Sequence, residues 1–460
     1  MKAVILNGPN NFDVTELPKP EIGDGDILLE MKKAAICGTD MRILAGTKTK
    51  GVRYPSVIGH EMCGVIAEVG KDVKGYEVGE KVSIANVIPC GSCPACLAGR
   101  ENACMNRKAI GYEFDGGFEE YIRIPEIAIK SGNVVKLPED VSFTAGALIE
   151  PLACCIRGLK NAGTGFNDTV LIVGAGPIGL MHMQLAKIAG AKEVIVSEPN
   201  EMRREVALEL GADKVVDPTT EDLPQIISEA TNGMGADVIV MAIGVPALVN
   251  STLKLCKKGG TVNLFAGFAG TGECTIEVNT IHYNEIKVNG STAYKREDYL
   301  EAADMVKTKK INLDRIATHT YSIEKFQNAY EMCKSGKGLK IIIEKKKRRK
   351  RTMAMLGKEV RMSRLVNPKS NKMMAITVDH AISRGIAPMT GLHHIQDTID
   401  KIILGKPDAM TMTKGIAEHC MWNHAGDVSM LMKISNYSPV APTNDTVFGT
   451  VDEAIRMGAD

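Results

Sequence analysis

The strongest indication of the fold is residues 170–179, which read Val170-Leu-Ile-Val-Gly174-Ala-Gly176-Pro-Ile-Gly179. An apolar run that leads into G-x-G-x-x-G predicts a buried strand, a tight glycine turn and a helix from about residue 177 to 189. The first glycine permits the turn, the second lets backbone approach a pyrophosphate, and the third lets the helix pack on the strand. The N-terminus of such a helix offers amide donors and a positive dipole to phosphates. The expected dinucleotide contacts are Gly174, Gly176, Pro177, Ile178 and Gly179.

The same alternation of strand and helix continues along the chain. Short apolar runs predict strands at residues 169–174, 193–198, 214–217, 236–242 and 260–266, with helical stretches between them. This rhythm is typical of a doubly wound parallel sheet that helices cover on both faces. A helix near residues 298–307 and a strand at 339–343 are expected to close the unit.

Glu198 lies 19 residues after Gly179, at the end of the second predicted strand of this sheet. A carboxylate there binds ribose hydroxyls and repels a 2′-phosphate, which favours NAD over NADP. Arg203 and Arg204 argue the other way, because a guanidinium accepts a 2′-phosphate. We expect NAD, with Glu198 and Arg203 as cofactor contacts. The alternative is that Glu198 is a solvated carboxylate at a strand end.

Residues 1–150 have a different pattern. Glycine and proline interrupt short alternating apolar runs, for example at residues 26–31 and 65–69, and the first eight residues also read as a strand. This pattern predicts a mainly β domain with many turns.

Four cysteines in this region have the spacing of a metal site. Cys90, Cys93, Cys96 and Cys104 form C-x2-C-x2-C-x7-C. Two-residue gaps let thiolates point at one centre, and four thiolates suit tetrahedral zinc with no position left for substrate. We therefore expect a structural zinc site, and two disulfides are the alternative.

Three further fragments carry potential metal ligands: Cys37-Gly38-Thr39-Asp40, Gly59-His60-Glu61 and Ile149-Glu150-Pro151. Each is weak alone, because a single cysteine or histidine is more often a core residue than a ligand. The three fragments are stronger evidence when they occur together with the cysteine motif, Asp115-Gly116-Gly117-Phe118 and the glycine turn. Residues 1–344 resemble the zinc-dependent medium-chain dehydrogenases, in particular the polyol and threonine dehydrogenases.

This resemblance implies the architecture. Residues 1–150 would form a GroES-like catalytic domain, completed by about 291–344 and carrying the structural zinc lobe at 90–104. Residues 151–290 would form a Rossmann dinucleotide-binding domain.

The resemblance also implies the catalytic groups. Cys37, His60 and Glu150 would bind a catalytic zinc, with Glu150 where classical alcohol dehydrogenases have a cysteine. Glu61 would lie beside the metal, and Asp40 would orient His60. Thr39 would accept a hydrogen bond from the substrate hydroxyl and pass the proton toward the cofactor ribose and solvent. The expected cofactors are two zinc ions per chain and NAD.

Two arginines are candidates for substrate recognition. Arg42 occupies the position at which some alcohol dehydrogenases continue the proton relay with histidine, and arginine does not release a proton near neutral pH. Arg42 and Arg157 therefore suit a substrate phosphate or carboxylate. The alternative is a surface Arg42 and a structural Arg157.

Composition limits the function classes. The chain has 460 residues, 44% hydrophobic, and a formal net charge of +1. No apolar run approaches the roughly 20 residues that span a bilayer. The twelve cysteines without an apparent export signal indicate a reducing compartment. We therefore expect a cytoplasmic protein without membrane or nucleic-acid partners.

Basic residues are concentrated in one tract, residues 345–351, which falls within an expected linker at 345–354. A solvated linker is the simplest interpretation of such a tract, and a nuclear-targeting or nucleic-acid role is the alternative.

Residues 355–460 resemble the N-terminal part of the class I aldolases of the archaeal fructose-bisphosphate type. The motifs are Gly357-Lys358-Glu359, Ala375-Ile-Thr-Val-Asp379-His380, Lys414-Gly415-Ile416 and Gly449-Thr450-Val451-Asp452-Glu453-Ala454. The resemblance implies an incomplete (β/α) barrel, with strands at 373–378, 409–413 and 428–434 and Asp379 at the top of the first. A full barrel needs roughly 250 residues.

The sequence thus predicts a zinc-dependent oxidoreductase that transfers hydride from a secondary alcohol, a polyol or a sugar-alcohol phosphate, to NAD. The alternatives are a bifunctional dehydrogenase–aldolase fusion, a threonine-type amino-alcohol dehydrogenase and a non-catalytic binding protein. The resemblance also implies a homo-oligomer, a dimer or tetramer, formed through the edge strands of the cofactor domain.

Overall fold

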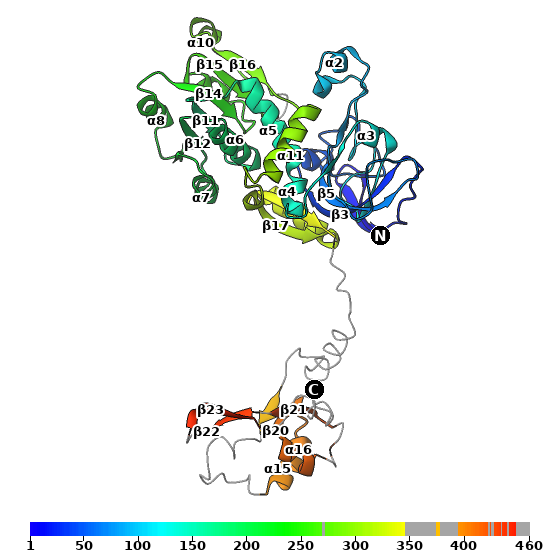
Figure 1. The fold of residues 1–460 in the computed structure, drawn as a ribbon. Helices are drawn as coiled ribbons and strands as arrows, with labels where there is room; N and C mark the ends of the chain where they lie inside the picture. Colours follow the sequence, from blue (N-terminus) through cyan, green and yellow to red (C-terminus); the bar gives the residue numbers. More distant parts are fainter. Residues whose placement is uncertain are drawn as a thin grey trace. The chain divides into compact units, whose positions relative to one another are not determined.

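The computed structural model describes residues 1–268, 272–345, 374–377, 394–421, 424, 427–433, 435–438 and 441–447. The chain divides into two compact units, Met1–Lys346 and Lys347–Asp460, which are drawn in Figure 1. None of the helices in these described segments combines the length and hydrophobicity needed to cross a bilayer. Residues 346–351 of the basic tract and Asp379 lie outside the described residues, as do the aldolase-like motifs at 357–359 and 449–454.

Mainly antiparallel strands build the N-terminal half of the first unit, with one parallel pair, β17 and β18. In its described residues, one sheet has the order β10-β6-β5-β3-β18-β17 with β9 also paired to β3, a second has the order β2-β1-β4, and β7 pairs with β8. The bounds are β1 Lys2–Gly8, β2 Asn11–Glu16, β3 Ile27–Ala35, β4 Ser56–Val57, β5 Glu61–Val69, β6 Lys81–Ile84, β7 Val87–Ile88, β8 Lys108–Ala109, β9 Tyr121–Ile124 and β10 Val134–Lys136. The mainly β character expected from the sequence is confirmed.

Short helices connect these strands. They are α1 Gly38–Leu44, α2 Pro94–Leu97, the 3-10 turn η1 Glu101–Ala103, α3 Glu126–Lys130 and α4 Phe143–Ala147. The longer helix α5, Ile149–Ala162, then leads into the second half of the unit.

A parallel sheet with the order β13-β12-β11-β14-β15-β16 forms the second half of the unit. Its strands are β11 Thr169–Val173, β12 Glu193–Ser197, β13 Lys214–Val216, β14 Ala236–Met241, β15 Cys256–Leu264 and β16 Lys287–Gly290. Every side chain of β11 is buried, as expected for a central strand covered on both faces. The five predicted strands are confirmed, and β16 is an edge strand that the sequence did not reveal.

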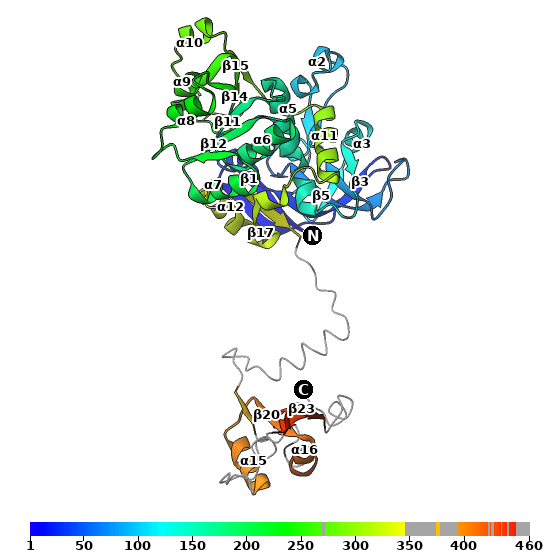
Figure 2. The same ribbon diagram turned by 60° about the vertical axis from the view of Figure 1, so that its left-hand side comes forward.

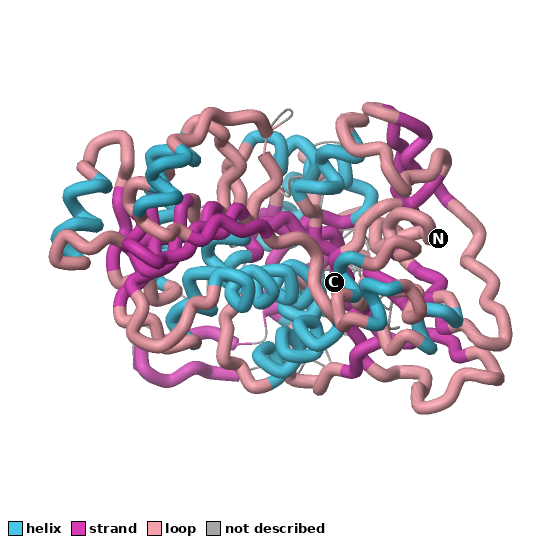
Figure 3. Tube along the Cα trace, turned by 90° about the horizontal axis from the view of Figure 1, so that it is seen from above, coloured by secondary structure: helices cyan, strands magenta, loops and turns pink. Residues whose placement is uncertain are grey.

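Helices lie on both sides of this parallel sheet, as the view from above shows (Figure 3). They are α6 Pro177–Ile188, α7 Glu201–Glu209, α8 Leu223–Ala230, α9 Leu248–Leu253 and α10 Val278–Tyr283. A large buried core joins α5 and α6 to one face of the sheet and includes Val170 and Ile172 of β11. A second core lies on the other face and includes Leu171 and Val173 of the same strand.

The chain then returns to the first sheet. Helix α11, Arg296–Lys307, packs beside α5 (Figure 1), and the 3-10 turn η2, Asp314–Ile316, precedes β17, Ala317–Ser322. The 3-10 turn η3, Ile323–Lys325, leads into α12, Phe326–Ser335, which lies against β17 and β18, Lys340–Glu344 (Figure 2). β18 pairs antiparallel with β3, so the end of the unit completes the N-terminal sheet.

The described part of the second unit contains a parallel sheet with the order β19-β20-β21. The strands are β19 Ala375–Thr377, β20 Ala409–Thr413 and β21 Ser429–Lys433, and the helices are α15 Ile395–Leu404 and α16 Lys414–Cys420. β22, Ser435–Ser438, and β23, Ala441–Val447, then form an antiparallel hairpin that the strand–helix rhythm of the sequence did not predict.

Candidate active site and metal centres

Strand register brings the candidate metal ligands together at the end of β3. In the pairing of β3 with β5, Ala35 lies opposite Glu61. Cys37 lies two residues after Ala35, and His60 directly precedes Glu61, so the cysteine and the histidine meet where β3 ends and β5 begins. The pairing of these two strands therefore brings together two residues that are far apart in the sequence.

Asp40 fixes both the cysteine and the histidine. One carboxylate oxygen accepts a hydrogen bond from the backbone N–H of Cys37 at 2.9 Å, which forms a capping box at the start of α1. The other oxygen lies 3.1 Å from Nδ1 of His60, and Asp40 is fully buried. Burial by itself lowers the pKa of His60, but Asp40, Tyr112 and Cys37 raise it well above its ordinary value. Because Asp40 holds Nδ1, the other ring nitrogen, Nε2, stays available to a metal.

The donor set fits a zinc ion. Among the described residues, ligand atoms of Cys37, His60 and Glu61 lie within 4.8 Å of one another. Sulfur, imidazole nitrogen and carboxylate oxygen are the ligands that catalytic zinc prefers. Oε2 of Glu61 is buried and has no hydrogen-bond partner among the described groups, so it keeps a free acceptor at this site.

Glu150 lies at the start of α5 and is buried, but it is not part of this 4.8 Å set. Burial raises the pKa of its carboxyl to about 7. The negative charges of Glu61 and Asp40 act in the same direction, and the positive charges of His60 and Lys340 oppose them. Glu150 therefore belongs to the electrostatic environment of the same site.

Lys340 is a member of this site that sequence reasoning missed. Its Nζ donates hydrogen bonds to Oε1 of Glu61 at 2.5 Å and to the carbonyl of Ile36 at 3.2 Å. β18 flanks β3 on the side opposite β5, with Ile342 opposite Ala35, so Lys340 reaches the same strand end. The signal available in the sequence was a lysine placed before the apolar run of β18.

Thr39 and Arg42 lie on α1 next to these ligands. Thr39 is half-buried, and its Oγ1 accepts a hydrogen bond from a guanidinium nitrogen of Arg42 at 3.2 Å. Arg42 also approaches the cofactor half, because a side-chain carbon placed on Gly267 would lie 3.1 Å from its Nη1. Arg42 therefore lies between the candidate catalytic site and the loop after β15.

Arg157, the other arginine singled out in the sequence, lies half-buried on α5. Its Nε is buried and has no hydrogen-bond partner among the described residues. A donor of this kind is costly unless a ligand or a water satisfies it.

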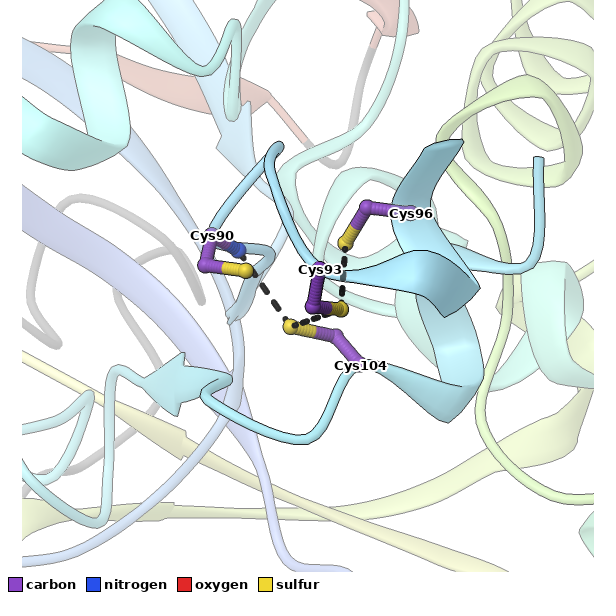
Figure 4. A group of neighbouring side chains, drawn as sticks. All are labelled: Cys90, Cys93, Cys96 and Cys104. Carbon is purple, nitrogen blue, oxygen red and sulfur yellow. Dashed lines mark hydrogen bonds between the residues drawn. The ribbon is translucent and has the colours of Figure 1, made fainter. Parts of the chain in front are cut away.

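The four cysteines of the metal motif converge in a separate lobe, with their sulfur atoms turned toward one another (Figure 4). Sγ of Cys93 lies 3.5 Å from that of Cys96 and 3.8 Å from that of Cys104. Thiolates around one zinc at about 2.3 Å lie about 3.8 Å apart, so the set fits tetrahedral zinc. Backbone N–H groups of Ser92 and Cys93 lower the pKa of Cys90 to about 6, which favours its thiolate.

The glycine turn has the geometry of a phosphate cradle. Gly174 has a φ of +98°, which favours glycine. A Cβ on Gly179 would lie 1.8 Å from the carbonyl oxygen of Gly174, whereas a Cβ on Gly176 would meet no atom within 4 Å. Pro177 begins α6 and Ile178 is partly buried against the core. The open space over Gly176 therefore fits a ligand at the N-terminus of α6.

Glu198 lies buried directly after β12, beside this turn. Its two carboxylate oxygens accept hydrogen bonds from the backbone N–H groups of Ala175 at 2.7 Å and Asn200 at 3.0 Å. Arg203 approaches Glu198 to 3.9 Å and donates to the carbonyl of Gly336, while its buried Nε has no partner among the described residues. Arg204 instead pairs with Asp217.

The chain combines a parallel dinucleotide-binding type of sheet with two groups of metal ligands. The four cysteines leave no ligand position for a substrate, whereas the group around Cys37 does, and this combination is typical of a zinc-binding dehydrogenase. Residues 23–139 match the model of the alcohol dehydrogenase GroES-like domain, and residues 177–308 match that of the zinc-binding dehydrogenases. The chain belongs to the family of zinc-binding medium-chain dehydrogenases. It is an enzyme that oxidises an alcohol with a nicotinamide dinucleotide, and it requires zinc.

Individual relatives agree with this assignment. The chain is 34% identical to the L-threonine 3-dehydrogenase of Thermococcus kodakarensis over 348 residues, which are 74% of this chain and 97% of that enzyme. A zinc-binding dehydrogenase from Sinorhizobium meliloti, crystallised with NADP, is 34% identical with a TM-score of 0.69, over 75% of this chain and 98% of that one. Galactitol-1-phosphate dehydrogenase from Escherichia coli is 26% identical with a TM-score of 0.68, over 75% and 100%.

Proposed function

We propose that the first unit transfers hydride from a secondary alcohol, a polyol or a sugar-alcohol phosphate, to NAD. The observation that carries this proposal is the convergence of Cys37, His60 and Glu61 within 4.8 Å, with Asp40 hydrogen-bonded behind His60. When bound, zinc would acidify the substrate hydroxyl and NAD would accept the hydride.

The metal-binding residues have separate roles in this proposal. Cys37, His60 and Glu150 hold the catalytic zinc, and Glu61 lies beside it. Asp40 keeps Nδ1 of His60 hydrogen-bonded, which orients the ring toward the metal. The free Oε2 of Glu61 supports a role for this carboxylate as an additional oxygen ligand that could hold the metal beside Cys37, His60 and Glu150.

Oγ1 of Thr39 accepts a hydrogen bond from the substrate hydroxyl, and Thr39 releases its own hydroxyl proton as it receives the proton of the substrate. Arg42 donates a hydrogen bond to this oxygen but does not take up a proton. The proton that leaves Thr39 therefore passes toward the cofactor ribose and solvent rather than along a histidine relay.

The cofactor half binds NAD through the glycine turn. Gly174, Gly176 and Gly179 shape the turn, with Pro177 and Ile178 at the start of α6. The buried carboxylate of Glu198, held by two backbone N–H groups, supports recognition of ribose hydroxyls and repulsion of a 2′-phosphate. Arg203 contributes to the same adenosine end of the site.

The lobe at 90–104 holds the second zinc through Cys90, Cys93, Cys96 and Cys104. Its four ligands leave no position for a substrate, so this zinc stabilises the lobe rather than taking part in chemistry.

NADH formation by the purified chain tests the proposal. The substrates are a free hexitol, its 1-phosphate and L-threonine, each with and without a zinc chelator. We expect chelator-sensitive NADH formation with the hexitol or its phosphate and a preference for NAD over NADP. Absence of turnover with all three substrates would contradict the proposal.

L-Threonine is the second candidate substrate. The 34% identity to the L-threonine 3-dehydrogenase of Thermococcus kodakarensis, over nearly the whole of that enzyme, supports it. Turnover confined to threonine in the same panel would replace the polyol assignment.

We also propose that the enzyme is a cytoplasmic homo-oligomer, a dimer or tetramer. The edge position of β16 in the parallel sheet supports pairing with a second copy through that strand. The clustered thiols at 90–104 support a reducing compartment, where they stay available to a metal.

For the second unit we propose the start of a class I aldolase-type (β/α) barrel. The parallel order β19-β20-β21 with intervening helices supports this assignment, whereas the β22–β23 hairpin departs from it. Removing residues 347–460 tests the bifunctional alternative: unchanged dehydrogenase kinetics and no aldol cleavage in the full chain would leave the first unit as the enzyme.

A further inference from the structure

We propose that Arg42, Lys48 and Arg107 form a subsite that binds an anionic group of the alcohol substrate, a phosphate or a carboxylate. These three residues are called the cationic subsite below. The inference rests on the proposed function and deepens it. It narrows the substrate to alcohols that carry an anionic group, and it adds Lys48 and Arg107 to the residues that recognise the substrate.

The Tyr112 ring links Lys48 to the catalytic site. Nζ of Lys48 lies 5.2 Å from the centroid of this ring, and the ring centroid of His60 lies 5.6 Å from it. Burial of Tyr112 raises its pKa to about 12, so the hydroxyl stays neutral and able to donate a hydrogen bond. Lys48 and His60 therefore both lie against the Tyr112 ring.

Arg42 extends the same positive region toward the reacting atoms. Its guanidinium donates to Oγ1 of Thr39, the oxygen proposed to take the substrate proton. The guanidinium is otherwise exposed, and its remaining N–H groups are available for a second acceptor.

The cationic subsite has no ion-pair partner in the described part of the chain. None of the ion pairs found there includes Arg42, Lys48 or Arg107, whereas other lysines and arginines such as Arg53 and Lys160 have one. Burial first, and then the charges of Arg107 and Arg42, lower the pKa of Lys48.

Glu113 is the carboxylate that opposes this effect on Lys48. It already accepts a hydrogen bond from the backbone N–H of Ala109 at 2.9 Å. Because these cations repel one another, an anion that binds among them lowers the electrostatic free energy of the site.

The substrate, rather than the dinucleotide, supplies this anion. The dinucleotide phosphates have their own candidate cradle at Gly176 and the N-terminus of α6, on the parallel sheet. Tyr112 instead belongs to the N-terminal half and lies beside His60, and Lys48 lies over the same ring. Two lysine or arginine groups around one phosphate or carboxylate are the usual recognition pattern for such anions.

The experiment compares steady-state kinetics of Lys48→Met, Arg107→Gln and the unchanged full chain loaded with zinc. Lys74→Met serves as the matched control, since Lys74 is an exposed lysine of the same half. The substrates are a free hexitol, the same hexitol 1-phosphate and L-threonine, and the KM for NAD is measured with each.

We expect each subsite variant to raise KM for the phosphorylated hexitol, or for threonine if the anion is a carboxylate, by about 10-fold or more, as loss of a charge-assisted hydrogen bond does. The KM for the free hexitol and for NAD should stay unchanged, and Lys74→Met should behave as the unchanged chain. Inorganic phosphate should compete with the anionic alcohol and lose this effect in Lys48→Met.

Other outcomes separate the two proposals. Equal kinetics of all variants on an active enzyme would overturn the cationic subsite and leave the proposed function standing. A raised KM for NAD with every alcohol would assign these residues to the dinucleotide and would also overturn the subsite. An unchanged chain that turns over none of the alcohols would contradict the proposed function itself.

Discussion

Lys340 donates a 2.5 Å hydrogen bond to Glu61 across 279 residues of sequence, and both side chains are buried. β3 lies between the strands that carry them, so the ion pair joins the end of the first unit to its beginning. A buried charge pair of this kind is balanced only while both partners remain.

Lys340→Met should therefore destabilise the first unit by about 3–5 kcal/mol, because it leaves the Glu61 carboxylate buried without its cation. The free energy of unfolding from urea titration measures the loss. Lys340→Met combined with Glu61→Gln is the matched control and should recover a large part of it. Equal destabilisation by the double variant would contradict a stabilising pair.

The pairing of Lys340 with Glu61 shows what sequence reasoning could and could not reach. Cys37 and Asp40 are three residues apart, so a local motif is sufficient to predict that both belong to the metal site. Lys340 enters the site only through the register of β18 on β3, which no local pattern encodes. Tyr112 was missed for the same reason, since it reaches His60 through tertiary packing.

The strands of the parallel sheet differ in how well the sequence predicts them. β11 is buried at every position and reads as a continuous apolar run before a glycine turn. β16, and likewise β17 at the edge of the N-terminal sheet, have only exposed and half-buried positions and contain asparagine, threonine or histidine, so their sequences resemble loops. Edge position, and not intrinsic propensity, makes them strands.

The buried His182 ring should make the stability of the fold decrease in acid. The imidazole is buried on α6 against Phe265, with a ring-centroid distance of 4.5 Å, and neither nitrogen has a hydrogen-bond partner among the described residues. Burial lowers the pKa of His182 to about 3. The unfolded chain takes up this proton near pH 6.5, so stability falls as the pH decreases from 6.5 toward 3.

His182→Leu should therefore stabilise the protein, and the gain at pH 5 should exceed the gain at pH 7.5 by about 2 kcal/mol. Thermal unfolding measured across this pH range gives the comparison. A variant whose stability changes with pH as steeply as that of the unchanged chain would show that His182 is not the group responsible.

Gly176 and Gly179 form a matched pair that separates ligand binding from folding. Gly179→Ala places a methyl group 1.8 Å from the carbonyl oxygen of Gly174 and should cost about 2–3 kcal/mol of stability. Gly176→Ala meets no protein atom and should leave the melting temperature unchanged. It should nevertheless raise KM for NAD at least about 10-fold, because the methyl group occupies the expected pyrophosphate position. Unchanged NAD kinetics in Gly176→Ala would remove the cradle assignment.

Two zinc ions are expected to have different roles, the one at Cys37 in chemistry and the one in the cysteine lobe in stability. Zinc content, melting temperature and alcohol-dependent NADH formation are measured in Cys37→Ser and in Cys93→Ser. We expect Cys37→Ser to lose one zinc per chain and its turnover but to keep its melting temperature, whereas Cys93→Ser should lose the other zinc and melt at a lower temperature. Full turnover in Cys37→Ser would show that the chemistry does not depend on a zinc at Cys37.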